Sequence, residues 1–381
     1  MSTGARRRFA VITIAVATLA AVAITRGGSS HSSRSTRDVA ERATTIPRPT
    51  STAAAKSSTS VSAPTPTTRA APKGTVTLAF AGDVHFEGPL RTALDANPAT
   101  VLSAIAPVLK SYDITMVNLE TAITERGTPA SKQFTFRAPP SALTALTDAG
   151  IDVATEANNH GEDYGPVGLA DSLAARAHSP GVHVIGIGND ADDAFSPYRA
   201  TVHGDRVAII AATQVIDDSV AAAWTATDSH PGLASAKDLP RLLGAVRSAR
   251  ATSDTVVVFL HWGVEGTHCP SADQRVIAKQ LIAAGADIVV GSHSHQLEGA
   301  GFDRADNGND GFVDYGLGNF AFYTGTTSGV LTLTVSGRHV EHYGWVPAAL
   351  RDARPEPLTG SDATQAITAW QSLRSCTDLA G

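Results

Sequence analysis

Four short apolar runs of this chain each end in side chains that commonly bind metal ions. These side chains are Asp83 and His85 after 76–80, Glu120 after 114–117, His261 after 256–260, and His293 and His295 after 286–290. Short runs of this kind are typical of buried strands, and in an α/β sheet the carboxyl ends of strands form an edge where ligand sites collect. His together with Asp and Glu suits borderline divalent metals. The sequence therefore predicts a metal site at such an edge.

Two of the ligand pairs have the spacing of an extended chain. Asp83 and His85 are two residues apart, as are His293 and His295, so both side chains of a pair share one face of a strand. Gly291, just before the second pair, allows close backbone approach. An isolated pair of this kind is more often a turn cap or a set of surface histidines. The position of both pairs after buried runs favours metal binding.

Further polar candidates lie in loops. Asn159 and His160 belong to the segment 157–165, which is too polar and rich in turn residues to be core. Asn159 offers an amide oxygen as a weak ligand and His160 a nearby acid, although a solvated turn remains the alternative. Glu265 follows His261 by four residues and could accept a hydrogen bond that orients the imidazole. We interpret the histidines at 183, 203, 230 and 268 as surface residues.

The net charge of −6 gives the chain no basic footprint, which excludes nucleic acid as an expected partner. Three arginines at 6–8 precede an apolar stretch at 9–25, so residues 1–26 are predicted to be a signal anchor or a signal peptide. The positive-inside rule then places the rest of the chain outside the cytoplasm, anchored to the membrane or, after cleavage, secreted. In that setting Cys269 and Cys376 could form a disulfide, and two free thiols remain the alternative.

Composition also divides the chain. Residues 27–73 are rich in Ser, Thr, Pro and Ala and predict a disordered linker, because they cannot bury enough apolar surface to fold. A folded domain is expected over 74–350, followed by a tail with a short helix over 351–381. The acidic segment 303–314 lacks the closing glutamate of a calcium loop and is interpreted as a polar hairpin turn.

Within 74–350, strand-like and helix-like segments alternate, which predicts an α/β fold. The expected helices are 99–110, 141–149, 167–177, 239–251 and 273–284. Antiparallel strands are also expected, as a hairpin of 198–202 with 207–212 and as the consecutive runs 312–315, 329–335 and 340–346. A mixed sheet, or two sheets packed face to face with helices outside, accommodates both patterns.

Seven ordered segments together resemble the CapA-type poly-γ-glutamate capsule synthesis proteins. They are Phe80-Ala81-Gly82-Asp83, Val117-Asn118-Leu119-Glu120-Thr121, Phe136-Arg137-Ala138-Pro139, the segment 157–165, Leu260-His261-Trp262-Gly263-Val264-Glu265, Gly291-Ser292-His293-Ser294-His295 and Gly316-Leu317-Gly318-Asn319-Phe320. The resemblance spans about 76–346, which is nearly all of the expected domain.

The CapA family is similar in turn to the calcineurin-like metallophosphoesterases. This resemblance implies a four-layer α/β/β/α sandwich with two mixed β-sheets and two divalent metal ions, which could be Mn, Zn, Fe or Mg. Carried across residue by residue, it implies one metal on Asp83, His85 and His295, a second on Asn159, His261 and His293, Glu120 as the bridge, and His160 as a catalytic acid or oxyanion partner. The chain departs from the phosphoesterases at the bridge, where Leu119-Glu120 replaces Gly-Asp.

The resemblance further implies a function at the cell envelope. The expected role is synthesis, release or attachment of an anionic polymer such as poly-γ-glutamate, with a dinuclear site of metal-dependent hydrolase type and a membrane capsule-synthesis complex as a possible partner. Arg137, Lys132 and Glu265 are candidates for substrate contact, although the two cations could equally be solvated or ion-paired. The alternatives are a phosphoesterase of the envelope and a polymer-binding protein without catalysis.

Overall fold

Successive side chains of strand β1 (Val76–Val84) are buried on alternate faces of a sheet. Leu78 and Phe80 join one apolar cluster, and Ala79 and Ala81 join another. A strand is apolar on both faces when both faces are covered, so β1 lies in the middle of a layered fold. The computed structural model, which describes residues 74–179 and 181–381, places β1 near the centre of an eight-stranded sheet.

This first sheet mixes parallel and antiparallel strands. Its order is β18-β17-β16-β1-β2-β5-β6, with β15 also paired to β1. β1, β2, β5 and β6 are parallel, whereas β16, β17 and β18 run antiparallel to their neighbours. The bounds are β2 (Ile114–Leu119), β5 (Val153–Thr155), β6 (His183–Ile185), β15 (Asn319–Ala321), β16 (Thr327–Ser336), β17 (His339–Arg351) and β18 (Arg354–Pro357).

A second, six-stranded sheet has the order β13-β14-β12-β11-β9-β8. Its strands are β8 (Tyr198–Val202), β9 (Asp205–Thr213), β11 (Thr255–Trp262), β12 (Ile288–His293), β13 (Ala300–Arg304) and β14 (Asp310–Asp314). β9, β11, β12 and β14 are parallel, and hairpins add β8 at one edge and β13 at the other. The predicted hairpin at 198–212 is confirmed, and the acidic segment 303–314 is a hairpin turn as expected.

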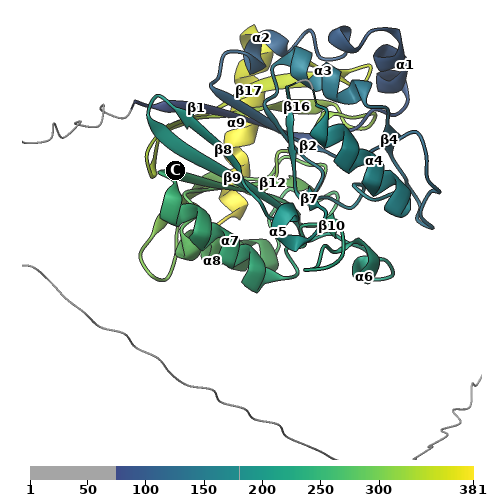
Figure 1. Cartoon of the computed structure of the whole chain (residues 1–381). Helices are drawn as coiled ribbons and strands as arrows, with labels where there is room; N and C mark the ends of the chain where they lie inside the picture. The colour runs from purple at the N-terminus through teal and green to yellow at the C-terminus, as the bar shows by residue number, and fades with distance from the viewer. Residues whose placement is uncertain (1–73, 180) are drawn as a thin grey trace, which may run out of the picture. The chain divides into compact units, whose positions relative to one another are not determined.

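Helices cover the outer faces of both sheets (Figure 1). The first sheet is covered by α1 (Pro89–Ala96), α2 (Ala106–Leu109), α3 (Ser141–Ala149) and α4 (Gly165–Ala177), and the second by α7 (Leu239–Thr252) and α8 (Ala272–Ala284). α8 begins with a capping box, in which Ser271 and Gln274 satisfy each other's backbone N–H groups. Short connecting elements are η1 (Pro98–Thr100), β3 (Ala122–Ile123), β4 (Arg137–Ala138), β7 (Ile187–Gly188), α5 (Ala191–Ala194), α6 (Ala221–Trp224) and β10 (Gly232–Leu233).

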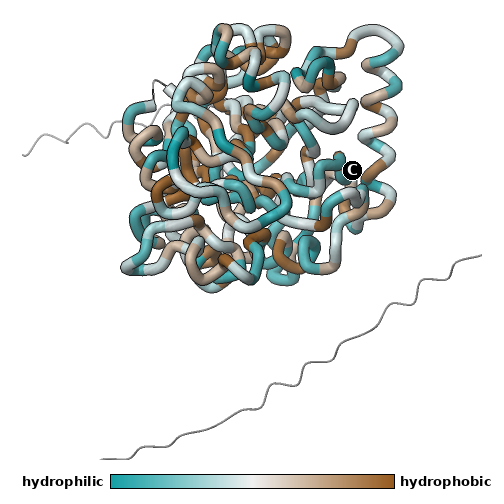
Figure 2. Tube along the Cα trace, turned by 90° about the vertical axis from the view of Figure 1, so that its right-hand side faces the viewer, coloured by the Kyte–Doolittle hydropathy of each residue, from teal (hydrophilic) through white to brown (hydrophobic). Residues whose placement is uncertain are grey.

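Three apolar clusters separate the four layers. One lies between the first sheet and its helices, one between the second sheet and α7 and α8, and one between the two sheets. The cluster between the sheets contains Phe80, Met116, Ile209, Phe259 and Val290, one from each of five parallel strands. Figure 2 shows apolar stretches running through the body of the domain beside hydrophilic turns. The predicted α/β/β/α sandwich with two mixed sheets is confirmed.

One expected helix is wrong. The apolar spacing predicts a single helix over 99–110, but the structure has the 3₁₀ turn η1, a run of turns, and the four-residue helix α2. Pro107 explains the difference, because proline lacks the N–H that an interior helical position donates. It is accommodated in the first turn of α2, so that the helix begins there.

The segment after residue 350 packs on the domain. β18 pairs with β17, α9 (Gly360–Ser372) lies against β17, and η2 (Leu373–Cys376) reaches β13 of the second sheet. Cys376 forms a disulfide with Cys269, which settles the alternative left open by the sequence. Figure 1 shows α9 in yellow beside β17. The expected tail therefore contributes a strand and a helix to the fold.

The predicted amino-terminal anchor and linker, 1–26 and 27–73, lie outside the described residues. Between Gly74 and Gly381, Pro180 excepted, the structure contains no helix that is both long enough and apolar enough to cross a membrane.

We expect the double change Cys269→Ser/Cys376→Ser to lower the free energy of unfolding by about 2–4 kcal/mol, because the disulfide closes a long loop and restricts the unfolded chain. The sequence separation of 107 residues makes this loop long. Urea unfolding of oxidised wild type and variant measures the effect. Reduced wild type is the control and should match the variant. An unchanged midpoint after complete reduction would contradict the prediction.

Candidate metal centre

The carboxyl ends of strands from both sheets converge on one buried site. β1 and β2 deliver Asp83 and Glu120, while β11 and β12 deliver His261 and His293. A bulge between Ala81 and Asp83 interrupts the register of β1 with β2, and such bulges redirect side chains at strand ends. The site thus forms where the sequence pattern predicts it.

Close backbone packing behind the site requires glycine at two positions. A Cβ atom at Gly82 would lie 1.8 Å from the carbonyl oxygen of Gly318, which accepts a hydrogen bond from the Asp83 N–H at 2.9 Å. A Cβ atom at Gly291 would lie 2.1 Å from the carbonyl oxygen of Tyr315. The close approach expected at Gly291 is therefore observed, and both glycines let a neighbouring strand press against a ligand-bearing one.

Two groups of three side chains are placed so that each could hold a metal ion. One consists of Glu120, His261 and His293, and the other of Asp83, Glu120 and His295. In each group the ligand atoms lie within 4.8 Å of one another. Glu120 belongs to both groups, which is the geometry of a bridging carboxylate.

The unpartnered atoms of the site fit a bound cation. Both carboxylate oxygens of Glu120 and Nδ1 of His293 are buried and have no hydrogen-bond partner in the described part of the chain. Burial, reinforced by the charge of Asp83, raises the pKa of Glu120 well above its usual value. An uncompensated buried carboxylate is costly, and metal ions commonly provide the compensation. Two carboxylates with several imidazoles suit borderline divalent metals.

His293 and His295 have backbone conformations that are rare for residues with side chains. Their φ angles are 101° and 56°, in the left-handed region that favours glycine. Such strain persists where the surrounding structure enforces it and is concentrated at functional sites. Here it brings the imidazole of His295 and the backbone N–H of His293 to Asp83. Nδ1 of His295 lies 3.3 Å from one Asp83 oxygen, and the His293 N–H donates to the same oxygen.

His85 and Asn159 lie beside the two groups without belonging to them. Nδ1 of His85 accepts a hydrogen bond from the Glu87 N–H at 2.9 Å, and its ring packs against Phe136 and Phe322. Burial lowers the pKa of His85 to about 3, so the imidazole is neutral at physiological pH. Oδ1 of Asn159 lies 2.7 Å from Nε2 of His261. The resemblance implies both residues as metal ligands, and Asn159 lies next to the candidate ligand His261.

A buried amide network fixes the ligands from behind. The Asn118 amide donates to Asp83 at 2.8 Å and lies 3.1 Å from Nδ1 of His261. The Asn158 amide donates to the Asn118 oxygen at 3.0 Å, and its own oxygen accepts from the backbone N–H of His160. The network thus connects both candidate metal groups to the loop that carries His160.

Two further polar side chains orient the ligand imidazoles. Ser292 Oγ lies 3.1 Å from Nδ1 of His261, and Asn319 Oδ1 lies 2.8 Å from Nδ1 of His295. Hydrogen bonds of this kind fix the ring orientation and the tautomer of a metal-binding histidine. Glu265, which the sequence suggested for this role at His261, is exposed on the loop after β11 and makes no hydrogen bond to it.

His160 faces the shared carboxylate and is held from its other side. Its Nε2 lies 3.8 Å from Glu120, and its Nδ1 lies 2.5 Å from Asp163. Asp163 also forms an ion pair with Lys132 at 2.9 Å, and Lys132 donates to the backbone oxygen of Asn159. Burial lowers the pKa of His160, although the hydrogen bond with Asp163 opposes this effect. A neutral histidine beside a carboxylate can take up or deliver a proton at such a site.

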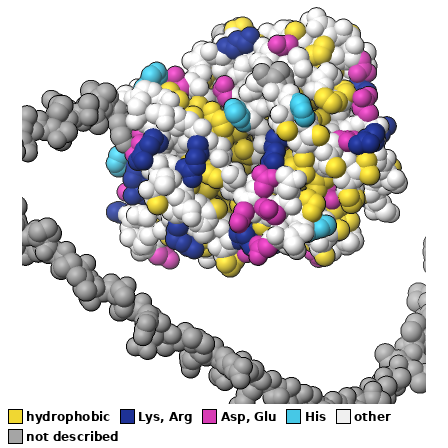
Figure 3. Space-filling view, viewed as in Figure 1, with side chains coloured by type: hydrophobic (Ala, Val, Ile, Leu, Met, Phe, Trp, Pro, Cys, Tyr) yellow, Lys and Arg dark blue, Asp and Glu magenta, His cyan; other side chains and the backbone are white. Residues whose placement is uncertain are grey.

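Arg137, a candidate for substrate contact, lies on the loop side of the site. Its guanidinium group stacks over the ring of Tyr164, with 4.8 Å to the centroid, and is only partly buried. Lys132 and Arg137 thus give this side of the site two cations. On the face of the molecule seen in Figure 3, basic and acidic side chains are interspersed without a continuous basic surface.

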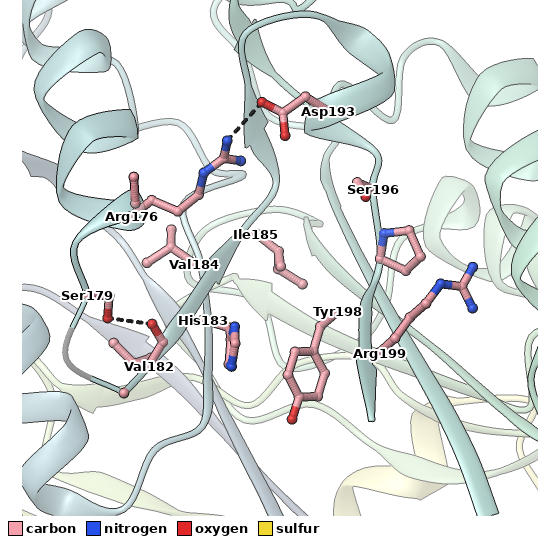
Figure 4. Close-up of a pocket in the computed structure, with 13 residues that line it drawn as sticks. Arg176, Ser179, Val182, His183, Val184, Ile185, Asp193, Ser196, Tyr198 and Arg199 are labelled. Atoms are coloured by element: carbon pink, nitrogen blue, oxygen red, sulfur yellow. Dashed lines mark hydrogen bonds and ion pairs between the residues drawn. The ribbon is translucent and has the colours of Figure 1, made fainter. Parts of the chain in front are cut away.

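A separate cavity of about 580 Å³ lies between the edge strands β6 and β8 (Figure 4). Its two arginines are already engaged, Arg176 with Asp193 at 2.8 Å and Arg199 with the hydroxyl groups of Thr252 and Ser253. None of the candidate metal ligands lines this cavity. It is therefore not part of the site.

Sequence reasoning did not assign roles to the residues that support the ligands, namely Asn118, Asn158, Asp163, Ser292 and Asn319. Asn118 carried a detectable signal, since it is a polar residue at the end of the otherwise apolar run 114–117. Asp163 follows His160 by three residues, which is a common spacing for a hydrogen bond across a turn. Ser292 and Asn319 carried no comparable signal, because only the fold brings them to the ligands.

We expect Glu156→Gln to stabilise the protein increasingly as the pH rises. Burial raises the pKa of Glu156 from 4.5 to about 8. With a folded-state pKa above the unfolded one, its stabilising contribution is complete below pH 4.5 and is lost as the pH rises through about 8. The neutral amide avoids this loss, so the variant should gain at least ~1 kcal/mol at about pH 9 and little at about pH 5.

Urea unfolding at both pH values measures this difference. Glu341→Gln removes an exposed carboxylate of β17 and serves as the matched control, with no change expected at either pH. An equal effect of Glu156→Gln at both pH values would contradict the assignment of a buried, neutral Glu156.

Comparison with known families identifies the class of protein. Residues 77–324 match the family described as Bacterial capsule synthesis protein PGA_cap. The matched range contains the whole ligand set, from Asp83 to His295. The chain therefore belongs to this family, as its seven segments predicted.

Individual relatives agree with this membership. The chain is 30% identical to the capsule biosynthesis protein CapA of Bacillus anthracis, over 75% of this chain and 70% of that protein. It is 27% identical to the PGA biosynthesis protein CapA of Bacillus subtilis (strain 168), over 74% of each. A probable polyglutamine synthesis accessory protein of Mycobacterium tuberculosis is 31% identical over 48% of this chain and 50% of its own length.

Solved structures were also compared. A hypothetical protein of Thermus thermophilus has a TM-score of 0.46 and 17% identity, covering 72% of this chain and 99% of its own. A phosphatase from Mycoplasma pneumoniae has a TM-score of 0.44 and 12% identity, covering 73% and 94%.

Proposed function

We propose that this protein acts in the synthesis, release or attachment of an anionic envelope polymer such as poly-γ-glutamate, through a dinuclear metal site. The observation that carries the proposal is the position of Glu120, which is shared by the two candidate ligand groups while neither of its oxygens has a hydrogen-bond partner among the described residues. The family membership and the names of the relatives support the polymer, since they refer to capsule and poly-glutamate synthesis.

The ligand set that we propose combines the two groups with the neighbouring side chains. Asp83, Glu120 and His295, with His85 beside them, would hold one ion, and Glu120, His261 and His293, with Asn159, would hold the other. Two metal ions held in this way would supply a hydroxide at neutral pH and would bind anionic oxygens of a substrate. Asp83 and Glu120 would neutralise part of the positive charge, and the amide network keeps Asp83 in place.

The surroundings of the site favour an anionic substrate. Lys132 and Arg137 lie on the same side as His160, and long-range attraction from cations raises the local concentration of anions. Lys132 is held by Asp163, so that its charge stays beside the site. The amino-terminal arginines and the apolar stretch after them support export, with the domain outside the cytoplasm and either anchored or released. A membrane capsule-synthesis complex would then be the natural partner.

The first test is the metal content of the full-length chain. We expect about two metal ions per chain by mass spectrometry, and a loss of most of this metal in His293→Ala/His295→Ala, because each candidate group then lacks an imidazole. His339→Ala/His342→Ala removes two exposed histidines of β17 and should leave the content unchanged. Circular dichroism confirms that each variant folds. A wild-type chain that stays free of metal after reconstitution would end the dinuclear proposal.

The role in polymer synthesis is tested in the organism. We expect a strain without the gene to show a changed amount, length or attachment of its surface polymer, restored by the wild-type gene but not by the His293→Ala/His295→Ala form. A surface polymer unaltered in all three properties would contradict this role.

A phosphoesterase of the cell envelope is a second candidate, which the arrangement of His160 favours. Its Nε2 faces Glu120 while Asp163 holds Nδ1, as expected of an imidazole that protonates a leaving oxygen. A polymer-binding protein without turnover is the third, and it would retain the metals and show ligand binding alone.

Turnover of a generic phosphodiester separates these candidates. For a phosphoesterase, His160→Ala should lower kcat by roughly 10²- to 10⁴-fold, because the acid is lost. Asp163→Asn should shift the alkaline limb of the pH profile to lower pH, since it removes the charge that orients His160 and stabilises its protonated form. Metal content should not change in either variant. Full turnover in His160→Ala would exclude His160 as the acid.

A further inference from the structure

A cavity of about 620 Å³ opens beside the candidate metal centre. One of its lining residues is His295, a candidate ligand, and the opposite wall is formed by the carboxyl-terminal helix α9 with Gln365, Ala369 and Trp370. The strand β17 and the loop around Thr326 complete it. His295 therefore places this cavity next to one of the two candidate metal groups.

The lining of the cavity is uncharged apart from histidine. It contains no Asp, Glu, Lys or Arg, and Lys132 and Arg137 are not among its residues. Of the two histidines in the lining, His295 already faces Asp83, so a carboxylate of an anionic polymer would gain little counter-charge here. The cavity therefore does not suit the charged part of such a polymer.

Polar groups without partners also exclude a purely apolar ligand. Within the described chain, the side chains of Gln296, Gln365, Thr326 and Thr327 line the cavity and make no hydrogen bond. An acyl chain would leave these groups unpaired when it excluded water from them. A ligand with several neutral hydroxyl or amide groups would satisfy them.

Trp370 supplies the most specific feature. The side chain is 4% exposed, yet its indole N–H has no partner among the described residues. Its ring stacks on Trp345, with 5.4 Å between centroids and an interplanar angle of 11°, which fixes its position. The indole nitrogens of both tryptophans are shut off from solvent, so Trp370 offers the cavity apolar ring surface rather than a hydrogen-bond donor. Leu297 and Leu373 add apolar surface to the same cavity.

The wall that carries Trp370 is tied to the domain at its end. The disulfide from Cys269 to Cys376 fixes η2, and Arg374 donates to the hydroxyl group of Tyr343 at 2.7 Å. This wall lies outside residues 77–324, the part that matches the family. The cavity thus adds to the metal centre a binding feature that the matched segment does not contain by itself.

We propose that this cavity binds a neutral sugar, with the hydroxyl or acetamido groups and the apolar ring face that its lining complements. The site would then take a substrate with two parts, an anionic group at the metals and a neutral sugar against α9. This extension rests on the proposed function for the chemistry at the metals, but sugar binding in the cavity does not require turnover.

The indole N–H signals of the full-length protein provide the test. The chain has four tryptophans, so its indole signals are few, and Trp370→Phe identifies the one of interest. On titration with N,N′-diacetylchitobiose we expect a saturable shift of the Trp370 signal. Ala369→Phe fills the cavity and should weaken this binding at least ~10-fold. Gln371→Phe adds the same ring at an exposed position of α9 outside the lining and should not.

Gln365→Ala gives a second, milder variant, which should weaken binding by loss of hydrogen bonds without filling space. No saturable shift with the sugar would overturn the proposal, as would equal affinity in Ala369→Phe and wild type. A γ-linked glutamate oligomer that shifts the Trp370 signal as strongly as the sugar would also overturn it.

Metal content measured on the same samples separates this proposal from the proposed function. Sugar binding in a chain without metal would retain the cavity assignment and end the dinuclear site. Metal binding without any sugar-dependent shift would retain the dinuclear site and end the cavity assignment.

Discussion

The rest of the site depends on the burial of two carboxylates, Asp83 and Glu120, where water cannot solvate them. The fold places both at strand ends between two sheets, and within the described chain it gives Glu120 no hydrogen-bond donor. Charge in such a place needs a counter-charge, and His295 supplies part of it, because Glu120 and Asp83 raise its pKa to about 10. Burial and the adjacent His295 lower the pKa of His293 to about 4, so that it offers a lone pair rather than a charge. A divalent metal ion would supply counter-charge to the carboxylates and would accept the lone pair of His293.

The sandwich explains why these groups meet. The carboxyl ends of β1 and β2 in one sheet face those of β11 and β12 in the other, and each strand is mostly apolar before its carboxyl end. The apolar residues of these strands pack between the two sheets, and the polar residues at the strand ends form the candidate site. The side-chain amides of Asn118 and Asn158 lie behind the ligands. Asn118 donates to Asp83 and Asn158 donates to Asn118, so the amides fix the ligands without competing for a metal.

The sequence predicted the features that depend on short, continuous segments of the chain. Apolar runs predicted the parallel strands, and the ligands directly after them predicted where the site forms, since a strand end and its next residues are fixed by the same segment. It failed for 99–110, where Pro107 breaks an apparently helical pattern. It also could not find the ion pair of Lys132 with Asp163, or the bond of Asn319 to His295, because these contacts join segments whose proximity arises only on folding.

The candidate metal centre and the cavity beside it come from two parts of the chain. The second part is α9 with η2, which the disulfide at Cys376 ties to the domain. Every candidate ligand is present once the chain has reached His295, whereas the wall containing Trp370 is supplied by the last segment. Under the two proposals, the residues that bind the metal ions and the residues that select the substrate therefore lie in different segments. If the cavity binds part of the substrate as proposed, a substitution in α9 would alter the choice of substrate while the candidate ligands keep their positions, and reduction of the disulfide would loosen this wall.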